Sequence, residues 1–371
     1  MLGDPARDLL DVCRRLSAVA APAGHEDRLV ALVLEHLRGR SHECRVDRMG
    51  QVSVELGARD AGRTILVTAH LDELGLMVRG WDDLGMLLVH RLGGMPERVL
   101  PGLRVVVHTR DMDVVGVMGI KSHHLTPPEE KYLARPATEL YLDIGAASAA
   151  EVEAAGIRVG DPVTYAPQWD VLRGGRFSGK SLDNRVGVAA LLALVDRWAA
   201  EAPAAHVVAA FTTQEEFHVR GTLPLVAHFQ PDIVVNIDIA PASDTPDLRG
   251  QGRMALGAGP MVSRMNFHGR GTLGGLIPHP ALVAAMERAA ARAAVPVQYD
   301  ATIGVITDAA FVPMATAAGV AAVGVGVPVR YTHSPTETGQ LSDLEALVDL
   351  VDAATPELAE ASLDRPFHQE S

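Results

Sequence analysis

Short apolar segments alternate with amphipathic segments along most of this chain, and that alternation restricts the folds open to it. Four segments have the β-branched, near-continuous apolar character of buried strands, namely residues 64–69, 206–212, 232–237 and 320–327. Apolar residues at helical spacing predict helices at 4–20, 26–39, 184–200, 280–294 and 341–361. Because such strands suit a sheet covered on both faces, we predict a three-layer α/β sandwich whose mixed sheet is largely parallel.

Residues 74–167 differ from the rest of the chain in their pattern of apolar and turn residues. Here short Val-rich runs are separated by Gly, Pro and Asp turns, a pattern typical of a small all-β module. A chain of 371 residues is long enough for one sizeable core and a smaller module. We therefore expect an inserted β-rich domain at 74–167 and a main, catalytic domain formed from 1–73 and 168–371.

Composition argues against several kinds of partner. The net charge of -13 disfavours nucleic acid or an anionic membrane, since phosphate groups are bound by clustered Lys and Arg. No apolar run approaches the length of a membrane span, and the N-terminus is predicted to form an amphipathic helix and not a signal peptide. Cys13 and Cys44 are too few for a disulfide framework. These features favour a cytoplasmic protein that binds small molecules, peptides or copies of itself.

Acidic residues and histidines gather where each of the four predicted strands ends. The clusters occupy residues 70–73, 214–216, 236–238 and 328–333, the last of which ends in a histidine. In open α/β sheets, ligands bind outside the carboxyl ends of the strands. We therefore expect these side chains to converge on one crevice.

The first two clusters each divide into two roles. His70 and Asp72 are two residues apart on an extended segment, so their side chains point the same way and Asp72 can take the second ring proton of a metal-bound His70. Glu215 and Glu216 are adjacent and cannot share one direction, so one can bind metal while the other faces substrate and water. A polar strand end facing solvent and an ordinary acidic turn are the structural alternatives.

The remaining candidate ligands also have structural alternatives. Asp183 stands at the mouth of a predicted helix, where it could instead be a helix cap. Asp238 ends a strongly apolar strand, and a carboxylate is costly to bury there unless it is paired or metal-bound. His333 could equally be a loop histidine. We interpret all three as metal ligands, together with His70 and Glu216.

A charge count favours two metal ions. Two divalent ions bring four positive charges, which Asp183, Glu216, Asp238 and one hydroxide balance while both histidines stay neutral. Such a pair can lower the pKa of a shared water and polarise the carbonyl that the water attacks. Peptide hydrolysis then needs only a general base that later protonates the leaving amine, and Glu215 is the candidate. The mixed His and carboxylate set suits zinc or cobalt, with manganese as a further candidate.

These motifs resemble those of the M42 metallo-aminopeptidases, the tetrahedral or glutamyl aminopeptidase-like group of dinuclear metal exopeptidases. The resemblance covers nearly the whole chain, and the motifs fall in the family's order: AHLDELG (69–75), GKSLDNRVG (179–187), QEEFHVRG (214–221), NIDIA (236–240), ITDAA (306–310) and PVRYTHSPTE (328–337). It implies a sandwich of the zinc-exopeptidase type and an enzyme that removes the N-terminal residue of peptides.

The resemblance also implies that one carboxylate is shared by both metals. Asp183 would bridge the two ions, His70 and Asp238 would complete one site, and Glu216 and His333 would complete the other.

Other roles implied by the resemblance concern proton transfer and assembly. Glu215 would act as acid and base, and Asp72 would orient His70. The β-rich insert would be a PDZ-like dimerisation domain, and the dimers would assemble into a hollow tetrahedral dodecamer.

The substrate pocket departs from the family's pattern. His218 stands where the family usually has a small residue, and a longer, basic loop at 119–130 replaces the family's short Gly-x-x-Pro-Pro-His loop. That loop could reach an active site or be exposed with incidental histidines. The candidate pocket walls are His218, Thr307, Asp308, Arg330, Tyr331, His123 and His124. The motifs leave open which N-terminal residue is removed.

Three other functions fit part of the pattern. An M20-like acylase, dipeptidase or carboxypeptidase also uses two metals, but its second domain is typically an α/β lid inserted after the bridging carboxylate, whereas here the β-rich insert precedes Asp183. A glycan hydrolase would need two carboxylates flanking a sugar and no His ligands, and 4% aromatic residues offer few stacking platforms. A catalytically silent assembly protein would be expected to lose a ligand or the base, and this chain retains the full set.

Overall fold

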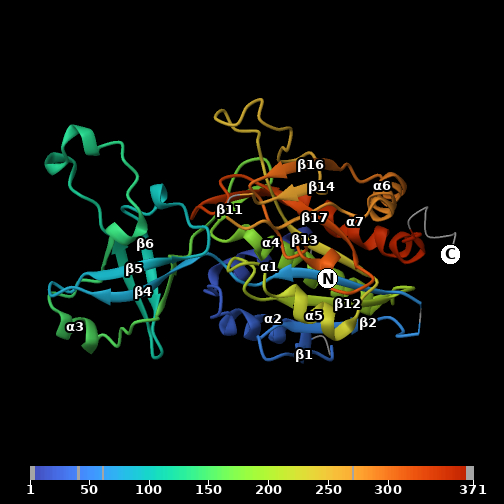
Figure 1. Ribbon diagram of the computed structural model, residues 1–371, viewed down its shortest axis with the longest axis horizontal. Helices are drawn as coiled ribbons and strands as arrows, with labels where there is room; N and C mark the ends of the chain where they lie inside the picture. Colours follow the sequence, from blue (N-terminus) through green and yellow to red (C-terminus); the bar gives the residue numbers. More distant parts are fainter. Residues whose placement is uncertain (1–4, 40–41, 61, 270, 365–371) are drawn as a thin grey trace.

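A nine-stranded mixed sheet forms the centre of the molecule (Figure 1). The computed structural model describes residues 5–39, 42–60, 62–269 and 271–364. The strands of this sheet are β1 (Arg45–Val46), β2 (Val52–Leu56), β3 (Thr64–His70), β12 (His206–Thr212), β13 (Ile233–Pro241), β14 (Met261–Phe267), β15 (Gly275–Leu276), β16 (Gln298–Ile303) and β17 (Ala321–Val329). Their order is β1-β2-β12-β3-β13-β17-β14-β15, with β16 beside β14.

The four strands predicted from the sequence are neighbours in this sheet. β12, β3, β13 and β17 lie side by side and parallel, so their carboxyl ends meet at one edge. β2 runs antiparallel to β12, and β14 runs antiparallel to β17. The prediction of a mixed sheet with a parallel centre is therefore confirmed.

Helices cover both faces of the sheet. They are α1 (Pro5–Ala18), α2 (Asp27–Gly39), α4 (Leu182–Ala200), α5 (Thr222–Phe229), α6 (Pro280–Ala293) and α7 (Leu341–Glu360). Ile65 of β3 and its partner Val207 of β12 face a core shared with α1, α2, α4, α6 and α7. The next pair along the two strands, Leu66 and Val208, faces a second core with α5. This alternation explains the apolar strands, because each strand must fill two cores.

The five predicted helices form close to their predicted bounds, while the short helix α5 was not predicted from the sequence. Within α4 the first turn is irregular, because Asp183 and Asn184 have non-helical backbone angles. Ser181, just before it, has a left-handed backbone with φ of 57°. The Asp183 side chain is therefore presented from a distorted turn and not from a regular helix.

A closed six-stranded barrel stands to one side of the sheet (Figure 1). Its strands are β4 (Gly75–Trp81), β5 (Leu87–Leu92), β6 (Arg104–His108), β7 (Asp113–Met118), β8 (Tyr141–Asp143) and β9 (Pro162–Tyr165), and it carries the short helix α3 (Ala149–Ala154). The barrel has a hydrophobic core of its own, which includes Leu76, Val89 and Leu142. A further three-stranded sheet contains β10 (Trp169–Val171), β11 (Arg176–Gly179) and β18 (Glu337–Gln340).

Candidate metal centre

The side chains singled out by the sequence meet at the carboxyl edge of the parallel strands. His70 is the last residue of β3, and Asp238 lies in β13. Glu215 and Glu216 follow the end of β12, and His333 follows the end of β17. The convergence expected at this edge is therefore observed.

The Asp183 carboxylate lies at the centre of this cluster. Its Oδ1 is 3.2 Å from His70 Nε2, and its Oδ2 is 3.4 Å from His333 Nε2. His70 Nε2 is also 3.8 Å from Asp238 Oδ1, and His333 Nε2 is 3.8 Å from Glu216 Oε1. Asp183 thus belongs to two groups of three donors.

Each group fits one metal ion. The first consists of His70, Asp183 and Asp238, the second of Asp183, Glu216 and His333, and within each group the donor atoms lie within 4.8 Å of one another. Glu216 Oε1 is buried and has no hydrogen-bond partner in the structure. Because a buried, unpartnered carboxylate oxygen is costly, these donor sets match the needs of divalent cations.

The raised pKa values of two carboxyl groups in the cluster also favour bound cations. Burial raises the pKa of Glu216 to about 7, and the negative charge of Asp183 adds to this effect. Burial likewise raises the pKa of Asp238 to about 8, again helped by Asp183. A bound cation favours the ionised form of each carboxylate and would reverse both shifts.

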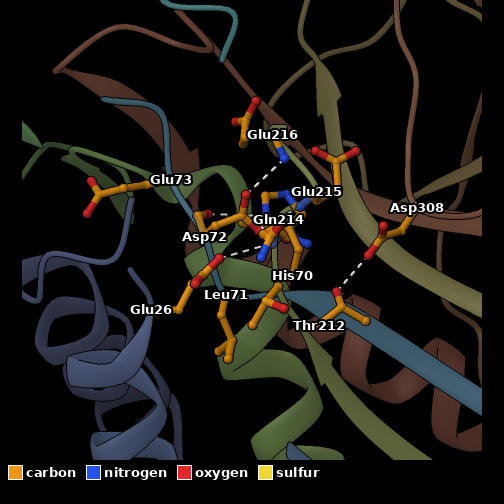
Figure 2. Close-up of polar contacts among 12 residues, drawn as sticks. Glu26, His70, Leu71, Asp72, Glu73, Thr212, Gln214, Glu215, Glu216 and Asp308 are labelled. Atoms are coloured by element: carbon orange, nitrogen blue, oxygen red, sulfur yellow. Dashed lines mark hydrogen bonds and ion pairs between the residues drawn. The ribbon is translucent and has the colours of Figure 1, made fainter. Parts of the chain in front are cut away.

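Glu215 lies beside both groups and belongs to neither. Its side chain diverges from that of Glu216, as Figure 2 shows. Burial raises the pKa of Glu215 well above its ordinary value, and the nearby charges of Asp238 and Glu216 raise it further. A carboxyl group whose pKa is raised in this way is suited to accept and return a proton near neutral pH.

Asp72 makes contacts beyond the one with His70 that the sequence predicts. His70 Nδ1 lies 3.2 Å from the main-chain oxygen of Asp72 and 3.6 Å from its carboxylate. The two carboxylate oxygens of Asp72 instead accept the backbone N–H groups of Glu215 and Glu216, each at 2.9 Å (Figure 2). Asp72 therefore holds the His70 ring mainly through its main chain and the paired glutamates through its side chain.

Two further residues that hold the site in place, Glu337 and Gly94, were not predicted from the sequence. The Glu337 carboxylate is buried and accepts the backbone N–H of Asp183 at 2.9 Å and that of His333 at 2.6 Å. The main-chain oxygen of Gly94, from the loop after β5, lies 3.1 Å from His333 Nδ1. A side chain at Gly94 would crowd the His333 ring, since a Cβ there would lie 3.2 Å from it. Glu337 lies inside a motif noted above, but nothing in the sequence marks Gly94.

An open cavity of about 980 Å³ lies over the cluster. Asp183, Glu215, Glu216, Asp238 and His333 form part of its wall. Other wall residues come from both parts of the molecule, among them His218, His268, Thr272 and Thr307 from the main body and His90, Arg91 and Pro136 from the barrel region. The cavity is large enough for several residues of a peptide.

Of the predicted pocket residues, His218 and Thr307 line the cavity. The others lie elsewhere. Asp308 is buried behind it and accepts the Thr212 hydroxyl at 2.6 Å. Arg330 donates to Asp244 through two nitrogens, at 2.7 and 2.6 Å, and the neighbouring Tyr331 is 54% exposed.

His123 and His124 occupy an exposed turn of the barrel region and are not in the cavity wall. Nearby, Glu130 pairs with Lys121 and Arg135 at 2.8 and 2.6 Å, so these three charges compensate one another. Within the described ranges, no helix is both long and apolar enough to cross a lipid bilayer.

Comparisons with known proteins cover nearly the whole chain. Residues 50–350 match the family described as M42 glutamyl aminopeptidase. An Escherichia coli (strain K12) protein named "Putative aminopeptidase SgcX" is 34% identical over 335 residues, which cover 90% of this chain and 89% of that protein.

Two solved structures share the complete fold. Aminopeptidase APDkam598 from the archaeon Desulfurococcus kamchatkensis has a TM-score of 0.90 at 32% identity, and the match covers 99% of this chain and 100% of that one. The TET1 peptidase of Pyrococcus horikoshii, described as able to assemble into a tetrahedron or a large octahedral shell, has a TM-score of 0.83 at 29% identity. That match covers 94% of this chain and 99% of the other.

Proposed function

The chain belongs to the M42 glutamyl aminopeptidase family, and from that premise we propose that it removes N-terminal residues from peptides with two divalent metal ions and Glu215 as the proton-transfer group. One observation carries the proposal. Two donor groups share Asp183, and Glu215 stands beside both while belonging to neither. This arrangement separates metal binding from proton transfer, as metal-assisted peptide hydrolysis requires.

In this proposal His70 and Asp238 hold one ion, Glu216 and His333 hold the other, and Asp183 contacts both. Divalent ions at these sites would supply Lewis acidity, which polarises a peptide carbonyl and makes water a better nucleophile near neutral pH. The donor set suits zinc, cobalt or manganese.

Glu215 then carries the proton. Its carboxylate takes a proton from the attacking water and returns it to the amine that leaves, so the general base of one step is the general acid of the next. The contacts from the Asp72 carboxylate to the backbone of Glu215 and Glu216 keep the base and the ligand side chains apart. His218 and Thr307 stand in the wall that would receive the substrate.

We further propose that the β-rich part of the chain, 74–167, is a PDZ-like dimerisation module and that dimers build a tetrahedral dodecamer. Large apolar side chains are exposed on it: Val115, Val117, Ile120, Leu125 and Tyr132, with Tyr132 at 94%. Contact between subunits would bury such side chains, and exposed apolar patches are typical of protein interfaces. Light scattering coupled to gel filtration measures the mass directly. We also propose a reducing compartment such as the cytoplasm, because Cys13 and Cys44 are too few for a disulfide framework.

The activity is tested with matched peptides that differ only at the N-terminus. The chain, loaded with zinc, cobalt or manganese, should release the first residue of a free peptide and leave the N-acetylated peptide intact. Chelation should abolish turnover, and adding metal should restore it. Release of the C-terminal residue, or hydrolysis of the acetyl group, would instead support the carboxypeptidase or acylase alternatives.

A further inference from the structure

The backbone N–H groups of residues 214, 215 and 216 all donate hydrogen bonds to two buried carboxylates, those of Glu26 and Asp72. The N–H groups of Glu215 and Glu216 donate to Asp72, as described above. The N–H of Gln214 donates to Glu26 Oε1 at 3.1 Å. Figure 2 shows Glu26 beneath this segment, on the side opposite the Glu215 and Glu216 carboxylates.

The segment held in this way has an unfavourable backbone. Gln214, His218 and Val219 all have left-handed conformations, with φ of 59°, 71° and 48°. Such angles are costly for residues other than glycine, above all for a β-branched valine, and they persist only where surrounding contacts impose them. The turn has two internal hydrogen bonds, from Val219 N–H to the Glu215 oxygen at 2.8 Å and from Arg220 N–H to the Gln214 oxygen at 3.3 Å. Its first residues depend on Glu26 and Asp72.

Glu26 is itself firmly placed. Its side chain is buried, and the same Oε1 accepts the N–H of Gly24 at 2.8 Å. The loop before Glu26 is fixed to the chain beyond β3, since Ala21 N–H donates to Glu73 Oε1 at 2.8 Å and Glu73 N–H donates to the Ala21 oxygen at 2.9 Å. Glu26 belongs to neither donor group of the candidate metal centre.

We infer that Glu26 is a positioning residue for the paired glutamates: by accepting the Gln214 N–H, it fixes the start of the turn that aims Glu215 and Glu216. Both expected effects rest on the proposed function, one on its metal sites and the other on its peptidase activity, and the cobalt titration tests the first without the second. Glu26 acts as a hydrogen-bond acceptor. A glutamine at this position offers an oxygen of the same reach, while a methionine of similar length offers none.

The test compares Glu26→Gln and Glu26→Met with Asp343→Met as the matched control. Asp343 is also buried and accepts two backbone N–H groups, from Gly257 at 2.7 Å and Gly259 at 2.8 Å, but it is not part of the cavity wall. Metal affinity is measured by titrating each apo-protein with cobalt against a competing chelator. The values of kcat and KM are measured separately on an aminoacyl chromogenic amide.

Glu26→Met is expected to weaken the binding of one of the two cobalt ions about tenfold and to lower kcat at least tenfold, with KM within about threefold of the wild type. Glu26→Gln should keep both values within about threefold of the wild type. Asp343→Met should lower the melting temperature without changing kcat per folded subunit. If Glu26→Met does not fold, Glu26→Asp, which withdraws the acceptor by one methylene, takes its place with the same expected direction.

Unchanged cobalt binding and kcat in Glu26→Met, or a loss confined to KM, would overturn the inference. Equal losses in Glu26→Gln and Glu26→Met would overturn the acceptor role in favour of charge. A wild-type protein that binds cobalt but hydrolyses no peptide would contradict the proposed function alone, because the cobalt titration still decides the role of Glu26.

Discussion

Asp183 directs one carboxylate oxygen at His70, with 3.2 Å between Asp183 Oδ1 and His70 Nε2, and turns its other oxygen toward the second donor group. In the proposed two-metal site, a residue shared in this way would couple the occupancy of the two ions. A ligand that belongs to one group affects mainly that group.

Metal stoichiometry should reveal this difference. Asp183→Ala is expected to lose both ions, because each group falls to two donors, whereas His70→Ala and His333→Ala should each retain close to one ion per subunit. Elemental analysis of dialysed protein measures the ratio. If Asp183→Ala kept one tightly bound ion, Asp183 would not be a bridging ligand.

Replacing the proposed base should separate catalysis from metal binding. Glu215→Gln keeps the size and the backbone contacts to Asp72 but cannot take up a proton, so kcat should fall by about 10²- to 10⁴-fold. Metal content and KM should stay close to those of the wild type. Full activity in this variant would exclude Glu215 as the proton carrier.

The ionisation of Glu26 should make the protein less stable as the pH rises. Burial, together with the charge of Asp72, raises its pKa from 4.5 to about 7. Between these values the folded chain retains a proton that the unfolded chain has released, so this contribution to stability is present below pH 4.5 and is lost as the pH rises toward 7.

Glu26→Gln removes that ionisation. The free energy of unfolding of the variant, relative to the wild type, should therefore rise by up to about 3 kcal/mol across this pH interval. Urea titrations at several pH values measure the difference. A constant difference across the interval would show that the Glu26 pKa is not raised.

The buried pair of Lys180 and Glu73 should be sensitive to the loss of one partner. Lys180 Nζ lies 2.5 Å from Glu73 Oε2, both side chains are buried, and Arg185 lies 3.4 Å from the other oxygen. Lys180→Met removes the nearer of the two cations that compensate the buried Glu73 carboxylate and should therefore cost about 3–5 kcal/mol of stability. The double variant Lys180→Met with Glu73→Leu should lose less than the sum of the two single variants, which a double-mutant cycle of chemical unfolding tests.

His218 should influence which N-terminal residues are accepted. It lines the cavity and has a left-handed backbone with φ of 71°, so glycine can replace it without added strain. His218→Gly is expected to raise kcat/KM for bulky N-terminal residues about tenfold relative to alanine. Gln230→Gly, another left-handed position that lies outside the cavity wall, serves as control, and a panel of aminoacyl amides measures both.

The sequence predicted the parallel centre of the sheet because each strand must fill two cores and is therefore apolar along its whole length. Once four such strands are parallel neighbours, the polar residues after them must meet at one edge. The positions of His70, Asp238 and Glu216 follow from this argument. α5 escaped prediction because it is short and contains Pro224, which weakens any helical pattern.

The supports of the site were harder to predict. β3 ends at His70, so the two-residue alternation of a strand does not extend to Asp72, and its carboxylate turns to the backbone of Glu215. Glu26 and the Gly94 oxygen act on residues far away in the sequence through single contacts. A single buried acceptor has no repeating pattern, so neither contact leaves a signal in the sequence.

The positions of the proposed ligands along the chain also determine when the site can form during protein synthesis. The proposed ligands of the two ions are spread along the chain from His70 to His333. Helix α7 follows His333 and packs against α4, near the start of which Asp183 lies. A nascent chain still lacking β17 cannot assemble the second donor group. Uptake of an ion by the second group should therefore occur only after nearly the whole chain has left the ribosome, and it would report that synthesis is close to complete.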